Sequence, residues 1–260
     1  MAVLLGWKRE ETGDADVRGP EAAVEGEARV RCPHAVGVTA IGGAAAAYIF
    51  LARPRHLTWG ATDQESDERL PGDDLIANAD LAATRAITIR ASAEQVWPWI
   101  AQLGQGRGGF YSYDFLENLV GCDIHSADHI VPEWQEVGVG DQVNFSPEVG
   151  LVVALLERGR SLVLRGGVQM GNIAPPYDFT WAFALRAEPD ETTRLLVRER
   201  YGYTRPWARL LVEPVEAVSF VMSQKMLRGV KERAERTAGP DGHLVTKDLA
   251  CGRRLGVRTG

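Results

Sequence analysis

Six short runs of the chain have the alternating apolar pattern or the composition of β-strands. The first run, 84–90, places Ile87 and Ile89 on one face. The other five, in order, are 142–145, 151–157, 161–165, 178–186 and 193–203. Turn-forming residues join 151–157 to 161–165 and 178–186 to 193–203, which predicts two β-hairpins.

Helical spacing of apolar residues occurs in three places. Ser92 and Gln95 have the spacing of a capping box, which predicts a helix that begins there. A second short helix is predicted at 113–120. The longest stretch, 207–236, has an apolar stripe, and its Pro214 either splits the stretch or opens a second helix. The stripe consists of Leu211, Val215, Val218, Met222, Met226 and Val230.

The order of these elements predicts the fold. One strand, two short helices, a meander of antiparallel strands and a long terminal helix indicate an α+β domain over 80–237. In this domain a curved antiparallel sheet wraps around the C-terminal helix. One helix cannot fill the concave face of such a sheet everywhere, so we expect a cavity between the two.

The apolar segment 35–52 has 18 residues and no charge. A helix of that length spans about 27 Å, close to the hydrocarbon thickness of about 30 Å in a bilayer. The segment is therefore predicted to be a single transmembrane helix, and a buried or surface-lying Ala/Gly helix is the alternative. The leader 1–34 and the tail 238–260 are expected to be disordered, and the acidic stretch 53–79 to be a linker.

The charge and cysteine content narrow the choice of partners and compartment. The chain has 29 basic and 35 acidic residues, a formal net charge of −6, so no overall basic field attracts nucleic acid. Its three cysteines lie far apart and are odd in number, which favours a reducing compartment. Together with segment 35–52, this predicts a single-pass membrane protein whose domain faces the cytoplasm. A cytoplasmic protein is the alternative.

The stretch 83–141 (ATRAITIRASAEQVWPWIAQLGQGRGGFYSYDFLENLVGCDIHSADHIVPEWQEVGVGD) resembles the first half of bacterial proteins of the SRPBCC superfamily. The likeness extends over about 52–237. It is greatest to an uncharacterised group of the polyketide cyclase/dehydrase type that has an N-terminal hydrophobic segment. The resemblance implies the START-like helix-grip fold. The superfamily includes lipid transfer proteins, ligand receptors, aromatase/cyclases and chaperone cofactors, so the fold does not decide the function.

Two motifs that resemble metal or phosphate sites lack the partners such sites need. Cys122, His125 and His129 have the spacing of metal ligands, but no second CxxC and no HExxH motif completes a site. The glycine-rich loop 104–109 lacks the Gly-Lys-Ser/Thr ending of a P-loop and follows a helix instead of a strand. We therefore expect no metal and no cofactor. We interpret the loop as a hinge, which in the fold it resembles lies near one mouth of the cavity.

Aromatic side chains are the main candidates for ligand contact. Phe179, Trp181 and Phe183 share one face of a strand, where they either pack in the core or line the cavity. Tyrosine hydroxyls and either Arg198 or Arg200 are the predicted polar groups that orient an apolar ligand. The complete set of predicted ligand-binding residues is Tyr111, Phe179, Trp181, Phe183, Arg198, Tyr201, Met222 and Met226.

Three functions fit these features. The first is a membrane-tethered domain that binds a small hydrophobic or lipid-like molecule in the cavity. The second is an aromatase/cyclase-type enzyme that uses the same cavity, with Glu117, His125 or Glu199 as the acid or base. The third is a non-catalytic interaction module. The element order, segment 35–52 and the resemblance favour the first, so we expect binding rather than catalysis.

Overall fold

The computed structural model describes residues 52–147, 149–167 and 175–239. The leader, nearly all of segment 35–52 and the tail beyond 239 lie outside these residues, so the predictions made for them stay predictions. Among the described residues, no helix combines the length and the apolarity that crossing a membrane requires.

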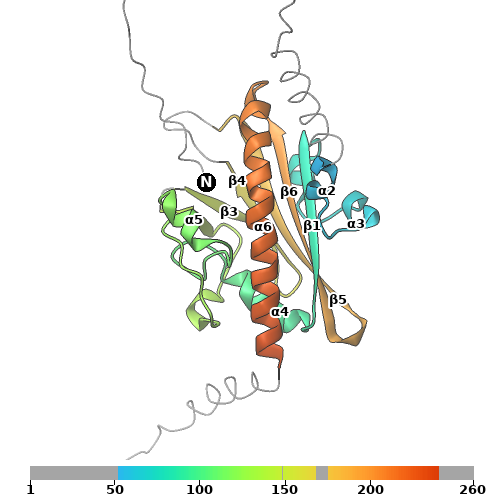
Figure 1. Cartoon of the computed structure of the whole chain (residues 1–260), viewed down its shortest axis with the longest axis vertical. Coiled ribbons are helices and arrows are strands. Elements are labelled where there is room, and N and C mark those ends of the chain that lie inside the picture. The colour runs from blue at the N-terminus through green and yellow to red at the C-terminus, as the bar shows by residue number, and fades with distance from the viewer. Residues whose placement is uncertain (1–51, 148, 168–174, 240–260) are drawn as a thin grey trace, which may run out of the picture. The chain divides into compact units, whose positions relative to one another are not determined.

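Six strands form one curved antiparallel sheet in the order β1-β6-β5-β4-β3-β2 (Figure 1). Consecutive strands from β2 to β6 are neighbours, and β1 pairs with β6. The strands are β1 (Leu81–Ile89), β2 (Gln142–Ser146), β3 (Val149–Glu157), β4 (Ser161–Gly166), β5 (Tyr177–Glu188) and β6 (Thr192–Tyr203). The predicted α+β class and the antiparallel meander are confirmed.

The helices are α2 (Arg53–Leu57), α3 (Asp63–Asp67), α4 (Ala93–Ala101), α5 (Asp114–Leu119) and α6 (Ala208–Ala238). Short 3-10 turns lie at η2 (Asp73–Ile76), η3 (Pro132–Trp134) and η4 (Pro189–Glu191). The predicted capping box of α4 is confirmed, because the backbone N–H of Ser92 donates to Gln95 Oε1 at 3.0 Å. Helix α6 runs through Pro214 as one helix, so the alternative of two helices is wrong.

The C-terminal half of α6 packs against α4 and the sheet (Figure 1). Its most buried apolar residues, each at most 2% exposed, are Met226, Leu227, Val230 and Ala234. Gly229 allows the loop before α5 to approach closely, because a Cβ at this position would lie 2.3 Å from the backbone oxygen of Tyr111. Glycine is the residue that fits such an approach. Apolar packing therefore fixes this half of α6.

The N-terminal half of α6 turns a different face to the sheet from the one that the apolar pattern predicts. Glu216 and Ser223 are buried, whereas Val218 of the predicted stripe is 48% exposed. The predicted stripe is displaced in this half, because two of the buried positions are polar and Leu211, Val215 and Met222 are only partly buried. As a result, apolar residues fall on the outer face of the helix.

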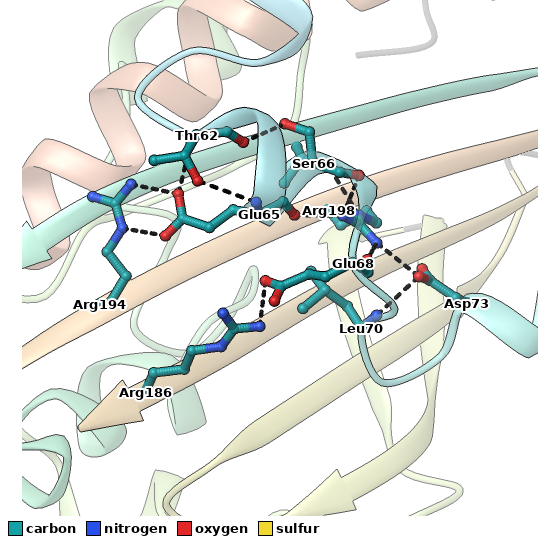
Figure 2. A network of polar contacts seen from close by, with 10 residues as sticks. Thr62, Glu65, Ser66, Glu68, Leu70, Asp73, Arg186, Arg194 and Arg198 are labelled. Atoms are coloured by element: carbon teal, nitrogen blue, oxygen red, sulfur yellow. Dashed lines mark hydrogen bonds and ion pairs between the residues drawn. The ribbon is translucent and has the colours of Figure 1, made fainter. Parts of the chain in front are cut away.

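Residues 58–76, which we call the strap, lie on the face of the sheet opposite α6 (Figure 2). Arg198 of β6 is 2% exposed, and its guanidinium donates to Asp73 Oδ2 at 2.7 Å and to three backbone oxygens of the strap at 2.8 Å. Arg194 donates to both carboxylate oxygens of Glu65, at 2.7 and 2.8 Å. Acidic residues of the predicted linker are therefore paired with arginines of the sheet.

Candidate functional site

Arg85 of β1 lies between the sheet and α6, at the centre of a buried group of ionisable side chains. Its Nη1 lies 2.7 Å from Glu199 Oε1 of β6, and its Nη2 lies 2.6 Å from Glu216 Oε1 of α6. Arg85 is fully buried, and both glutamates are at most 2% exposed. One guanidinium therefore joins the sheet to the N-terminal half of α6 through two charge-assisted hydrogen bonds.

Helix α2 supplies a further ionisable side chain to this group. His56 Nε2 lies 2.8 Å from Glu216 Oε2, and the imidazole stacks on the ring of Phe220 at 5.3 Å between centroids. The backbone oxygen of His56 accepts from Arg85 Nε at 3.3 Å. We call the whole group the Arg85 cluster; its members are His56, Arg85, Glu199, Tyr201, Glu216, Ser219 and Ser223.

Hydroxyl groups surround the carboxylate of Glu199. Ser219 Oγ lies 3.0 Å from Oε1 and 2.9 Å from Oε2, and Ser223 Oγ donates to Oε1 at 2.9 Å. The Tyr201 hydroxyl lies 3.4 Å from Oε2. Burying a carboxylate costs much free energy unless it is paired and hydrogen-bonded, and these contacts meet that requirement.

The cluster holds two carboxylates, one guanidinium and one imidazole. Burial raises the pKa of Glu216, while the positive charges of Arg85 and His56 oppose this rise because they favour the carboxylate. Burial also raises the pKa of Tyr201 well above its ordinary value, so its hydroxyl stays protonated and can donate a hydrogen bond. The cluster can therefore hold a proton near Glu216 and offer hydroxyl donors in the same interior space.

Aromatic side chains continue from the cluster along β5. Trp181 pairs with Glu199, and Phe179 pairs with Tyr201, so these side chains share the face that meets α6. The ring centroids of Phe179 and Tyr201 are 4.7 Å apart, as are those of Trp181 and Phe183. Trp181 is 6% exposed, and its Nε1–H has no hydrogen-bond partner among the described residues. We call Phe179, Trp181, Phe183 and Tyr201 the aromatic wall.

Side chains are less buried at the end of the aromatic wall that lies near the beginning of α6. Tyr177, Phe179 and Tyr203 are half-buried there and pack around Tyr201 and Val212. At the opposite end of the wall, Phe183 is 1% exposed and belongs to the main apolar core. The wall is therefore most accessible on the side of the Arg85 cluster.

Neither a model of a known protein family nor a curated protein matches the chain. Solved structures do match it. The Zhui aromatase/cyclase from Streptomyces sp. R1128 is 18% identical, with a TM-score of 0.36, and the match covers 62% of this chain and 98% of that chain. CalU16 from Micromonospora echinospora is 14% identical, with a TM-score of 0.30, covering 60% and 84%. Hypothetical protein jhp0584 from Helicobacter pylori is 11% identical, with a TM-score of 0.41, covering 67% and 99%.

The domain has a helix-grip architecture, in which a curved antiparallel sheet packs on a long C-terminal helix. The order of its elements, its antiparallel sheet and the long helix α6 packed on that sheet agree with the fold that the sequence predicts. At identities below 20% the likeness to these structures concerns the fold alone, and the activities of the neighbours are not carried to this chain.

The helix-grip domain brings some predicted ligand-binding residues together and separates others. The four residues of the aromatic wall share the α6 face. Met226 lies in the apolar core, and Met222 is partly buried beside Ser112, which donates to its backbone oxygen at 3.0 Å. Tyr111 is buried, and its hydroxyl donates to a backbone oxygen of α4 at 3.1 Å. Neighbours along a strand point to opposite faces, and Glu199 faces α6, so Arg198 lies on the opposite face. Its predicted role in ligand binding is therefore corrected.

The three predicted acid/base candidates do not form one site. Glu199 belongs to the Arg85 cluster, whereas the His125 side chain is 82% exposed and lies 3.3 Å from Asp123. Glu117 is half-buried on α5. Burial and the neighbouring Asp114 raise the pKa of Glu117 from 4.5 to about 7. Glu117 and His125 therefore lie outside the cluster.

The raised pKa of Glu117 predicts a specific pH dependence of stability. The folded state binds a proton here more tightly than the unfolded state, so the contribution of Glu117 to stability is fully present below about pH 4.5 and is lost as the pH rises through about 7. Glu117→Gln is expected to lose less stability than the wild type between pH 5 and pH 8 in urea unfolding. Glu133→Gln, at an exposed position, is the control. The same dependence of the free energy of unfolding on pH in the wild type and in Glu117→Gln would contradict the raised pKa of Glu117.

Sequence reasoning did not identify Arg85, Glu216 or His56. A signal for Arg85 exists, because it is in phase with Ile87 and Ile89 on the apolar face of β1. A charged residue in phase with an apolar strand face indicates a buried polar site. Glu216 does not lie in phase with the apolar stripe of its helix. His56 lies in a helix of five residues, which is too short to show a periodic pattern.

The two motifs that resemble metal and phosphate sites lie in loops. The described residues contain no group of three or more His, Cys, Asp or Glu side chains that could hold a metal ion. In the glycine loop, Gly104 and Gly109 each donate their backbone N–H to the other's oxygen at 3.0 Å. Arg107 also donates to the backbone oxygen of Ala101 at 3.0 Å. The loop is a hydrogen-bonded turn, and its role as a hinge stays a prediction.

A pocket of about 410 Å³ lies beside the outer side of α6. Acidic residues such as Asp114 and Asp128 and basic residues such as Lys225 and Arg233 line it. Arg233 Nη2 lies 3.0 Å from Asp128 Oδ1, so these charges largely satisfy one another. Between the sheet and α6, where an apolar cavity was predicted, the side chains of the Arg85 cluster occupy the centre.

Proposed function

We propose that this helix-grip domain binds a small, mainly apolar or aromatic molecule between the aromatic wall and the N-terminal half of α6. The position of the Arg85 cluster is the observation that carries the proposal. Apolar side chains could fill this interface at a lower free-energy cost, because charged groups lose their hydration when they are buried. Buried ionisable groups with shifted pKa values gather at functional sites. The cluster is therefore assigned to ligand recognition as well as to stability.

The wall and the cluster define the chemistry of this ligand. The rings of Phe179 and Tyr201 offer surfaces for stacking. The Nε1–H of Trp181 has no partner among the described residues, and a ligand oxygen would satisfy this buried donor. The guanidinium of Arg85 also attracts an oxygen acceptor. We therefore assign to the ligand an apolar or aromatic body with at least one acceptor oxygen.

Entry of the ligand requires the N-terminal half of α6 to move away from the sheet. This half is held by the hydrogen bonds and ion pairs of the Arg85 cluster together with the packing of Val212, whereas apolar packing fixes the C-terminal half. Pro214 also removes one backbone hydrogen bond from the N-terminal half. We propose that opening is confined to this half of the helix.

Membrane tethering by segment 35–52 is a separate part of the proposal. The segment lies outside the described residues, and its support is an uncharged apolar sequence of near-spanning length. Ligand binding by the domain does not depend on it.

The ligand proposal is tested by titrating the full chain with 8-anilinonaphthalene-1-sulfonate, an aromatic probe that carries an anionic group. We expect saturable binding of one probe per chain. Phe179→Ala should weaken binding about tenfold, because an aromatic contact contributes about 1.5 kcal/mol. Leu155→Ala is the matched control, since it removes an exposed apolar side chain of β3, and its affinity should equal that of the wild type.

Unsaturable binding, or equal weakening by both substitutions, would contradict the proposal. Near-UV circular dichroism of each variant verifies that the fold is intact. Native mass spectrometry of the full chain adds a test without a chosen probe. We expect the wild type to carry a small molecule that Phe179→Ala retains less well than Leu155→Ala does.

A further inference from the structure

The outer face of α6 carries an exposed apolar stripe. Trp207 at the helix start and Leu210, Val218 and Val221 along it follow helical spacing, on the side opposite the buried Glu216. Leu210 is 81% exposed, and the other three are about half exposed, at 46–48%. We call these four residues the outer stripe. A group of large exposed apolar side chains on one helix face is typical of an interaction surface.

Helix α5 adds exposed apolar residues beside the outer stripe. Phe115 and Leu119 are 77% and 73% exposed. The start of α5 is attached to α6, because the Tyr113 ring lies 6.0 Å from Lys225 Nζ and the Ser112 hydroxyl bonds to a backbone oxygen of α6. Two neighbouring helices therefore present apolar side chains to solvent.

Along α6 the charges near the outer stripe are mainly basic, whereas α5 carries the acidic residues Asp114 and Glu117. Within 205–228 the basic residues are Arg205, Arg209, Lys225 and Arg228. Glu213 is the acidic residue of this range outside the Arg85 cluster, and Arg209 Nε lies 2.6 Å from its carboxylate. An apolar stripe bordered by basic side chains is typical of helices that lie on anionic lipid.

The N-terminal half of α6, which carries the outer stripe, also contacts the first described helix of the chain. The apolar segment 35–52 leads directly into α2. His56 of α2 bonds to Glu216 and stacks on Phe220, both in the N-terminal half of α6. We propose that the outer stripe, extended by α5, lies on the surface of a membrane that contains anionic lipid.

The proposal is tested with the full chain and vesicles of phosphatidylcholine and phosphatidylglycerol whose acyl chains are brominated. Bromine quenches tryptophan at short range, and the difference between wild type and Trp207→Phe isolates the signal of Trp207. We expect at least half of the Trp207 emission to be quenched. The triple variant Leu210→Gln/Val218→Gln/Val221→Gln should lose this quenching. The matched control Val139→Gln/Val152→Gln/Leu155→Gln, which alters other exposed apolar residues, should keep it.

Three results would overturn the proposal. One is Trp207 emission that brominated vesicles leave unchanged, even if the chain sediments with the vesicles through segment 35–52. Another is equal quenching in the triple variant and the wild type. The third is a dimer in lipid-free solution that the same triple substitution dissociates, which would assign the stripe to a second copy of the chain. Probe binding in vesicle-free solution reports on the ligand proposal separately, and the triple variant should retain it.

Discussion

Replacing Arg85 with Met is expected to lower the free energy of unfolding by about 3–5 kcal/mol. Arg85 is fully buried and contacts Glu199 and Glu216 at 2.7 and 2.6 Å. Met has a similar length but no charge, so two buried carboxylates would lose the guanidinium between them, and Glu216 would keep only its contact with His56. A loss of this size is a large part of the stability of a typical domain, about 5–15 kcal/mol.

Urea unfolding followed by far-UV circular dichroism measures this loss. The control is Arg85→Met/Glu199→Gln/Glu216→Gln, in which the carboxylates are also removed, and it should recover most of the stability. Burial already raises the pKa of Glu216, and Arg85 opposes the rise. The pKa should therefore rise further in Arg85→Met, and the stability of that variant should fall more steeply than that of the wild type as the pH increases from 5 to 8. A single variant as stable as the wild type at pH 8 would contradict the role of Arg85.

Much of the fold could be predicted from local patterns. Turn residues and apolar alternation located the hairpins, and the Ser92–Gln95 box located the start of α4. These features depend on residues close together in sequence, so one sequence reveals them. Three residues of the aromatic wall, Phe179, Trp181 and Phe183, were also predicted to share one strand face, because side-chain direction follows from alternation alone.

The polar interior could not be predicted in the same way. Its contacts join residues as distant as His56 and Glu216, which are 160 positions apart. The apolar pattern of α6 was misleading in the same region, since Val218 is exposed and Ser223 is buried. A stripe search assumes that the buried face is the apolar one, and this assumption fails where a helix covers a polar site.

The alternation of β6 connects the two polar networks of the domain. Glu199 and Tyr201 face α6, whereas Arg194 and Arg198 face the strap. One strand therefore binds the helix on one face and the acidic segment on the other. The predicted ligand-binding set combined Arg198 with Tyr201, although residues three apart on a strand point to opposite faces, so both could not face the ligand.

The strap should detach when Arg198 is replaced with Met. The guanidinium of Arg198 makes five hydrogen bonds, to Thr84 Oγ1, Asp73 Oδ2 and three backbone oxygens, at 2.7–2.8 Å. Charge-assisted hydrogen bonds contribute about 1.5–3 kcal/mol each in favourable cases, but such contributions are not additive. We expect a loss of about 3 kcal/mol in the free energy of unfolding, with faster proteolysis within 58–76 under native conditions.

Arg186→Met is the matched control, because the Arg186 side chain also pairs with an acid of the strap, Glu68, but is 37% exposed. An exposed ion pair contributes about 0–1 kcal/mol, so this variant should stay close to the wild type in both measurements. Equal losses for the two variants would show that burial of Arg198 does not matter. Because Arg198 faces away from α6, its replacement should also leave probe affinity unchanged in the folded fraction, and a tenfold weaker affinity would place Arg198 functionally with the aromatic wall after all.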